Sequence, residues 1–124
     1  MARRTRREQA PTTMNLFHWL TERFSKRGKA LSRYHRGMAR SKKRDHQGAI
    51  DDYTATIGMP DAPLDVKAMA FYKRALAHVA AGNDQKGTDD LDAVVAMDGS
   101  PMNTKTMARQ QLVRMESRSR QSRS

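Results

Sequence analysis

Apolar side chains recur at helical spacing in six stretches of the chain, and turn-forming residues separate these stretches. In the first stretch Leu16, Phe17, Leu20 and Phe24 fall on one helical face, and Gly28 then offers a stop. The pattern predicts helices over about 14–27, 29–43, 47–57, 65–81, 84–97 and 103–116. We therefore expect an all-α protein whose last helix covers the open face of the helices before it.

The junctions between these stretches carry specific turn chemistry. Residues 44–46 form a tight turn, and the two prolines in 58–63 exclude a helix, so a loop is expected there. Asp65 can cap the helix that follows this loop. Gly82-Asn83 supplies a left-handed turn, and residues 98–101 end the fifth stretch.

The two ends of the chain have no apolar face. Residues 1–13 and residues 117–124 combine arginine with small polar residues, and neither segment shows hydrophobic periodicity. Such segments bury too little apolar surface to order themselves. The sequence predicts disordered basic tails at both ends of one helical domain over residues 14–116.

The chain matches itself when it is shifted by 38 positions. The identical pairs are Ala30 and Ala68, Tyr34 and Tyr72, Arg36 and Arg74, Ala39 and Ala77, Gln47 and Gln85, and Asp51-Asp52 and Asp89-Asp90. A period of about 35 to 40 residues is the length of a helix, a turn, a second helix and a connection. The sequence thus predicts a repeated helical hairpin.

Small residues stand where the two helices of each hairpin must approach closely. They are Gly37, Ala39, Ala49, Ala75, Ala77 and Gly87. Larger residues available for the next layer are Tyr53, Ile57, Leu91 and Val95. We expect small and large residues to alternate through one core.

These strings resemble the tetratricopeptide repeat family. The similarity is carried by Arg36-Gly37-x-Ala39 and Arg74-Ala75-x-Ala77, followed by Ala49-Ile50-x-Asp52-Tyr53 and Gly87-x-x-Asp90-Leu91. The resemblance implies a short helical solenoid of two helix-turn-helix repeats within about residues 30–101, with an N-terminal helix and a C-terminal capping helix. Arg33 and Arg40 depart from the family, since they stand where it has a bulky apolar residue and an aromatic one.

The resemblance also implies a concave groove lined by the first helix of each repeat. The matching residues are Leu31, Tyr34, His35, Met38, Met69, Tyr72, Lys73 and Leu76. Tyrosines and aliphatic side chains suit the apolar side chains of a bound peptide. The alternative is packing inside the protein, which we weigh equally for the methionines and less for the tyrosines. Some members of the family bind chaperone C-termini through a clamp of side chains on the groove helices. That clamp is absent here, because Tyr34 and Met38 occupy its positions.

Charge is distributed unevenly along the chain. The net charge is +11, with +12 in residues 1–44, −6 in residues 45–98 and +5 in residues 99–124. A basic face is expected from Arg33, Arg36, Arg40, Lys43 and Arg44. This basic face would suit the binding of phosphates, but neutralisation of its charge by the acidic helices is slightly favoured.

Several classes of function are excluded or disfavoured. The chain has no cysteine, its four histidines lie far apart, and it lacks phosphate-binding, dinucleotide-binding and nucleophile-elbow motifs. We therefore expect no enzyme activity, no metal and no cofactor. No apolar run is long enough to span a bilayer, so a cytoplasmic protein that does not enter the membrane is expected.

The sequence favours a non-enzymatic adaptor that binds a protein or peptide in the groove. The alternative is a basic protein associated with nucleic acid or ribonucleoprotein through the arginine-rich helix and the tails. Trp19 is expected to cover the repeat core, or else to be exposed as an anchor for a second copy in a homodimer.

Overall fold

The computed structural model describes the backbone of residues 2–123 and the side chains of residues 16–21 and 25–123. It consists of five helices: α1 (Ala2–Lys42), α2 (His46–Ile57), α3 (Leu64–Ala80), α4 (Asp84–Ala96) and α5 (Met102–Arg123). The expected all-helical class is confirmed for this part of the chain.

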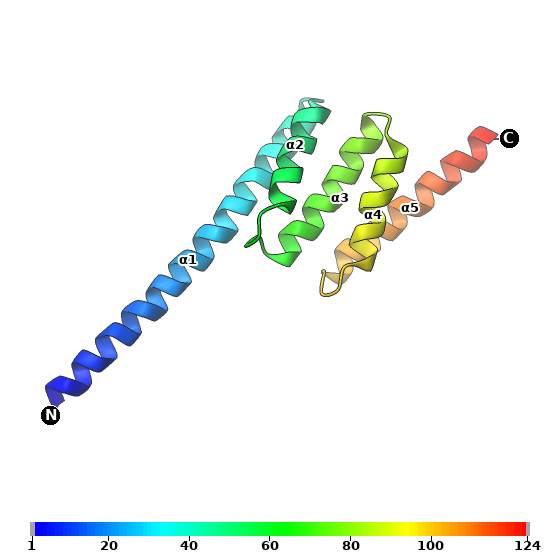
Figure 1. The fold of residues 1–124 in the computed structure, drawn as a ribbon. Helices are drawn as coiled ribbons and strands as arrows, with labels where there is room; N and C mark the ends of the chain where they lie inside the picture. The colour runs from blue at the N-terminus through cyan, green and yellow to red at the C-terminus, as the bar shows by residue number, and fades with distance from the viewer. Residues whose placement is uncertain (1, 124) are drawn as a thin grey trace.

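The helices follow one another in space in the order of the sequence (Figure 1). Each helix packs against the next, and α3 additionally contacts α1 and α5. The pairs α1/α2 and α3/α4 form two antiparallel hairpins, and α5 lies against the second hairpin. The N-terminal part of α1 and the C-terminal part of α5 project beyond the hairpins at opposite ends of the molecule.

The predicted stop at Gly28 is wrong, because α1 runs through it without a break. A glycine ends a helix when it adopts a positive φ, as Gly82 does at 87°, whereas Gly28 keeps helical geometry. Its neighbours Arg27 and Lys29 are good helix formers, which outweigh one glycine. The expected separate N-terminal helix is therefore part of α1 and does not fold back over the first hairpin.

Replacing Gly28 by alanine is expected to stabilise the protein by about 0.5–1 kcal/mol, because glycine costs roughly that much in a helix interior. A β-carbon at this position would meet no atom within 4 Å, so no clash offsets the gain. The gain is measurable as a rise in the urea midpoint of unfolding at unchanged slope. A lower midpoint would show that this point of α1 is not helical in solution.

Helices α2, α3 and α4 begin and end close to the predicted positions, whereas α5 begins close to its predicted start but extends past its predicted end. The loop over 58–63 is confirmed, since α2 ends at Ile57 and α3 begins at Leu64. Asp65 does not cap α3; the N-cap is Pro63, and the carboxylate of Asp65 instead accepts two hydrogen bonds from Arg27. The backbones of residues 2–13 and 117–123 lie in α1 and α5, where composition predicts irregular tails.

Both hairpin turns use a residue with positive φ at the same repeat position. Gly82 has φ 87° and Arg44, which lies 38 residues earlier, has φ 63°. The left-handed turn at Gly82-Asn83 is thereby confirmed. In the first hairpin Asp45 follows and caps α2, because its side chain accepts a hydrogen bond from the backbone amide of Gly48. This cap helps to hold a turn that lacks a glycine.

The core consists of two clusters of buried residues. The first joins α1, α2, α3 and the loop before α3 through Ala30, Tyr34, Ala49, Tyr53, Ala62, Val66, Ala70 and Ala77. The second joins α3, α4 and α5 through Ala75, Leu91, Val94 and Ala108. In this way α3 contributes to both clusters and connects the two hairpins.

Five of the six predicted small contact residues are buried, and Ala39 is not. A β-carbon on Gly37 would lie 2.6 Å from the ring of Tyr53, and one on Gly87 would lie 2.6 Å from Val79. Ala39 is exposed because it lies on the outer side of the first hairpin, whereas its counterpart Ala77 packs into the first cluster. The prediction for Ala39 was wrong, since no described helix packs against that side of α1.

The two hairpins use different pairs of residues at one contact, which predicts a coupled substitution. Gly37 faces Tyr53, while the equivalent positions hold Ala75 and Leu91. Gly37→Ala alone should destabilise by about 1–3 kcal/mol through overpacking against the Tyr53 ring. Adding Tyr53→Leu should recover part of that loss, because leucine leaves room for the alanine.

A double-mutant cycle in urea measures this coupling between positions 37 and 53. Purely additive effects of the two substitutions would contradict the proposed equivalence of the contacts.

Candidate interaction surfaces

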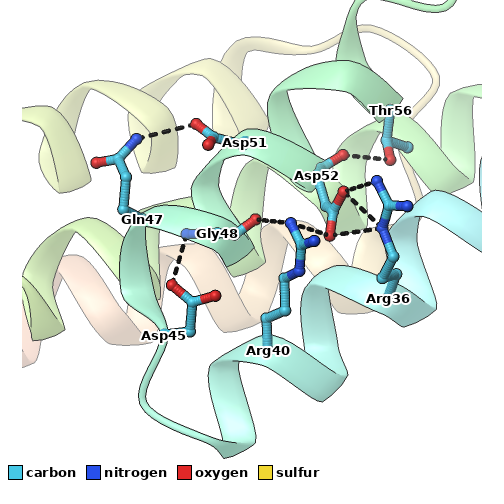
Figure 2. A network of polar contacts seen from close by, with 8 residues as sticks. All are labelled: Arg36, Arg40, Asp45, Gln47, Gly48, Asp51, Asp52 and Thr56. Carbon is cyan, nitrogen blue, oxygen red and sulfur yellow. Dashed lines mark hydrogen bonds and ion pairs between the residues drawn. The ribbon is translucent and has the colours of Figure 1, made fainter.

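A buried carboxylate joins the two helices of the first hairpin (Figure 2). Asp52 on α2 is almost fully buried and receives three hydrogen bonds from Arg36 on α1, the shortest of 2.6 Å from Nη2 to Oδ1. Arg40, one turn further along α1, lies 3.3 Å from the other carboxylate oxygen. The two arginines thus neutralise the buried charge.

The second hairpin repeats this arrangement 38 residues later. Asp90 on α4 receives hydrogen bonds of 2.8 and 2.7 Å from Arg74 on α3. His78 takes the place of Arg40 and lies 3.8 Å from Asp90. Arg74 also donates to the hydroxyl of Thr54 on α2, so the second ion pair contacts the first hairpin. The two ion pairs are therefore structural features of the repeat.

These contacts shift the ionisation of the groups involved. Hydrogen bonds from Arg36 hold the pKa of Asp52 below its ordinary value, and the same contact raises the pKa of Arg36. Burial lowers the pKa of His78. The carboxylate of Asp52 is therefore charged at neutral pH, as its role in the ion pair requires.

The predicted basic face is divided between paired and exposed cations. Arg36 and Arg40 hold Asp52, as the neutralisation hypothesis predicts. Arg33 on α1 and Lys43 and Arg44 at the first turn are exposed. Two of the five predicted residues thus have a structural role, and three lie on the surface.

The eight predicted groove residues are not among those that line the hollows described below. Leu31, Met38 and Met69 are partly buried and pack against the first core cluster, and Tyr72 packs against the second. His35 is exposed, while Lys73 and Leu76 are half-buried.

Tyr34 belongs to the core, with 8% of its surface exposed and its ring 6.0 Å from that of Tyr53. Burial raises the pKa of Tyr34, as expected for a phenol that is withdrawn from water. Tyr34 is therefore a packing residue in this structure, and its ring is closed to a partner.

The hollows found on the described surface lie elsewhere. One between α4 and α5 is lined by Leu112 and Met115 together with charged residues that include Asp84 and Arg120. A second lies between α1 and α2 beside Arg33 and Met59. Two adjoining hollows follow the outer side of α5 and share Val113 and Arg114.

The largest exposed apolar side chains gather on the projecting part of α1. Leu16 is 59% exposed, Phe17 is 73% exposed, and Leu20 lies on the same side of the helix. We call these three residues the α1 stripe. Trp19, one residue from Leu20, is 51% exposed, so the expectation that it covers the repeat core is wrong.

Among the described residues, no group of three or more histidine, cysteine or acidic side chains is placed to hold a metal ion. No helix in this part of the chain is long and apolar enough to cross a membrane. The surface is thus characterised by charge and by the α1 stripe.

The sequence could have indicated the two ion pairs. Arg36 and Asp52 each recur 38 residues later, with the same separation of 16 residues between arginine and aspartate in both hairpins. Opposite charges that repeat together are a signal for a contact between the two helices. The exposure of the α1 stripe had no comparable signal, because its pattern is that of any core-facing helix.

Comparisons of the chain with family models, with curated proteins and with solved structures gave no match.

Proposed function

We propose that the chain is a non-enzymatic protein-interaction module, built as a short tetratricopeptide-like solenoid, and that it binds an apolar segment of a partner protein through the α1 stripe. The repeated hairpin contacts, Arg36 with Asp52 and Arg74 with Asp90, support the solenoid. The single observation that supports binding is the exposure of Leu16, Phe17 and Leu20 on a helix that projects past its own hairpins.

Energetics favour this surface over the predicted groove. Fully burying a leucine or phenylalanine contributes roughly 1.5–3 kcal/mol, so covering the three partly exposed residues of the stripe would supply a few kcal/mol toward binding. The predicted groove offers less free apolar surface, because Tyr34 is buried and its aliphatic neighbours already pack against the core. The α1 stripe therefore replaces the groove as the proposed binding site.

The test compares the full chain with two variants on an affinity matrix in nuclease-treated lysate. Leu16→Asp with Leu20→Asp disrupts the stripe, and Met102→Asp is the control, since Met102 is a more exposed apolar residue that lies on α5. We expect specific partners on the wild type and on the control that are lost from the stripe variant. Identical proteins on all three would contradict the proposal. Circular dichroism of the variants verifies that their helices are intact.

A second candidate function is nucleic-acid binding, which is favoured by the exposure of Arg33, Lys43 and Arg44. Binding through phosphates depends steeply on salt, since each neutralised phosphate releases counterions. Fluorescence anisotropy with a single-stranded RNA at 50 and 200 mM salt should then show an affinity loss of about twentyfold for the three phosphate contacts that these residues can make. Charge reversal at the three residues should abolish the signal.

A further inference from the structure

Helix α5 occupies the position of a third first helix in the repeat. Thr104 and Ala108 of α5 are buried, and they lie 38 residues after Val66 and Ala70 of α3, which are also buried. The side of α3 that carries Val66 and Ala70 packs on the first hairpin. The corresponding side of α5, which carries Ala108, packs on the second hairpin. The chain thus contains two hairpins and the first half of another.

In the two complete hairpins, a second helix covers the other side of the first one. Gly37 of α1 meets Tyr53 of α2, and Ala75 of α3 joins Leu91 of α4 in one cluster. The next position in this series is Val113, which is 62% exposed. We define the outer face of α5 as the residues that line the hollow around it: Thr106, Arg109, Gln110, Val113 and Arg114.

In the repeat register Leu112 and Glu116 take the places of Arg74 and His78, so the charge that suits this face follows from its own flanking arginines and not from an Asp90-like contact. Helix α2 has two aspartates and no lysine or arginine, and α4 has four aspartates and one lysine. The outer face of α5 carries Arg109 and Arg114 on either side of an exposed valine. An acidic helix with an aliphatic residue at its centre is therefore complementary in both charge and shape.

A second copy of α5 is a poor occupant of the same face. Arg109, Arg114 and Arg118 are spread on both sides of Val113, so an antiparallel pair would place arginines of the two copies together. Like charges brought together at an interface oppose association.

We propose that the outer face of α5 binds an acidic amphipathic helix of a partner protein, which completes a third hairpin. An aliphatic side chain of that helix covers Val113, and its carboxylates meet Arg109 and Arg114. This inference depends on the repeat register and is independent of the α1 stripe.

The proposal can be tested by NMR titration of the full ¹⁵N-labelled chain with a helix-stabilised peptide that has the sequence of residues 84–97. Chemical stabilisation of the helix is needed because a free peptide of this length is marginally helical. We expect shifts at Thr106, Arg109, Gln110, Val113 and Arg114. A scrambled peptide with the same number of aspartates should bind more weakly, because it lacks an apolar face.

Two variants and two controls sharpen the test. Arg109→Glu with Arg114→Glu should weaken the peptide about tenfold, and Val113→Asp should weaken it by a similar factor. Lys43→Glu with Arg44→Glu makes the same charge change at the other end of the molecule and should leave the affinity unchanged. The stripe variant Leu16→Asp with Leu20→Asp should also bind normally, which separates this inference from the proposed function.

Several results would overturn the proposal. They are the absence of shifts at millimolar peptide, shifts away from the outer face of α5, or equal weakening by Lys43→Glu with Arg44→Glu. A single-stranded oligonucleotide that displaces the peptide from α5 at equal concentration would assign the face to nucleic acid instead. Dimerisation that is abolished by Val113→Asp in sedimentation equilibrium would assign it to a second copy.

Discussion

Substituting Tyr53 by alanine is expected to destabilise the protein by about 3–5 kcal/mol, the range for deleting a large buried aromatic side chain. Tyr53 is the largest fully buried side chain, and burial raises its pKa to about 12. Its ring packs against Tyr34 and fills the space that Gly37 leaves open. The free energy of unfolding of a small domain is only about 5–15 kcal/mol, so the Tyr53→Ala variant should be close to unfolding at 37 °C.

Urea unfolding followed by circular dichroism measures this loss, with Tyr53→Phe as the control. Phenylalanine keeps the ring contacts with Tyr34 and Gly37, so the control should retain most of the stability. A loss below about 1 kcal/mol for Tyr53→Ala would mean that α2 does not pack on α1 as described.

Substituting Asp52 by asparagine is expected to cost about 2 kcal/mol at pH 7, in the range of hydrogen bonds to charged groups. The loss stays below that of a fully buried ion pair, because Arg36 and Arg40 reach water and can be rehydrated. Asp90→Asn should cost more, since the side chain of Arg74 is 19% exposed whereas that of Arg36 is 52% exposed. Urea midpoints of the two variants test this order.

The effect of Asp52 should depend on pH in a defined direction. Its pKa is lower in the folded protein than in the unfolded chain, so its contribution to stability is complete above the unfolded value of about 4. The contribution is lost as the pH falls through the lower folded pKa. The difference in unfolding free energy between wild type and Asp52→Asn should therefore shrink toward zero in acid. A constant difference from pH 7 to pH 2 would show that charge is not the cause.

The repeat made much of this fold predictable. Three of the five helices, α2, α3 and α4, begin and end within a few residues of their predicted positions, because Pro60, Pro63 and Gly82 enforce the turns between them. Helix α5 begins close to its predicted start but extends past its predicted end. The predicted helix end at Gly28 was wrong, since a glycine ends a helix only where the chain can turn back and pack. Whether it does so depends on tertiary contacts that the local sequence does not contain.

The candidate surfaces were harder to predict for a related reason. Tyr34 and Tyr72 are identical in the repeat, yet Tyr34 is buried and Tyr72 is half-buried, because they pack against different neighbours. Ala39 and Ala77 differ in the same way, since only Ala77 packs against a neighbouring hairpin. Position within the stack decides exposure, and two identical strings of residues cannot encode it.

The unbroken course of α1 through Gly28 makes this helix a spacer of fixed length. With a rise of about 1.5 Å per residue, Leu16 lies about 30 Å along the axis from Gly37 at the first hairpin contact. A molecule held at Leu16 would therefore be kept at a set distance and on a set side of the hairpins. Inserting one residue between them would rotate the attachment point by about 100° and should uncouple anything that must contact both.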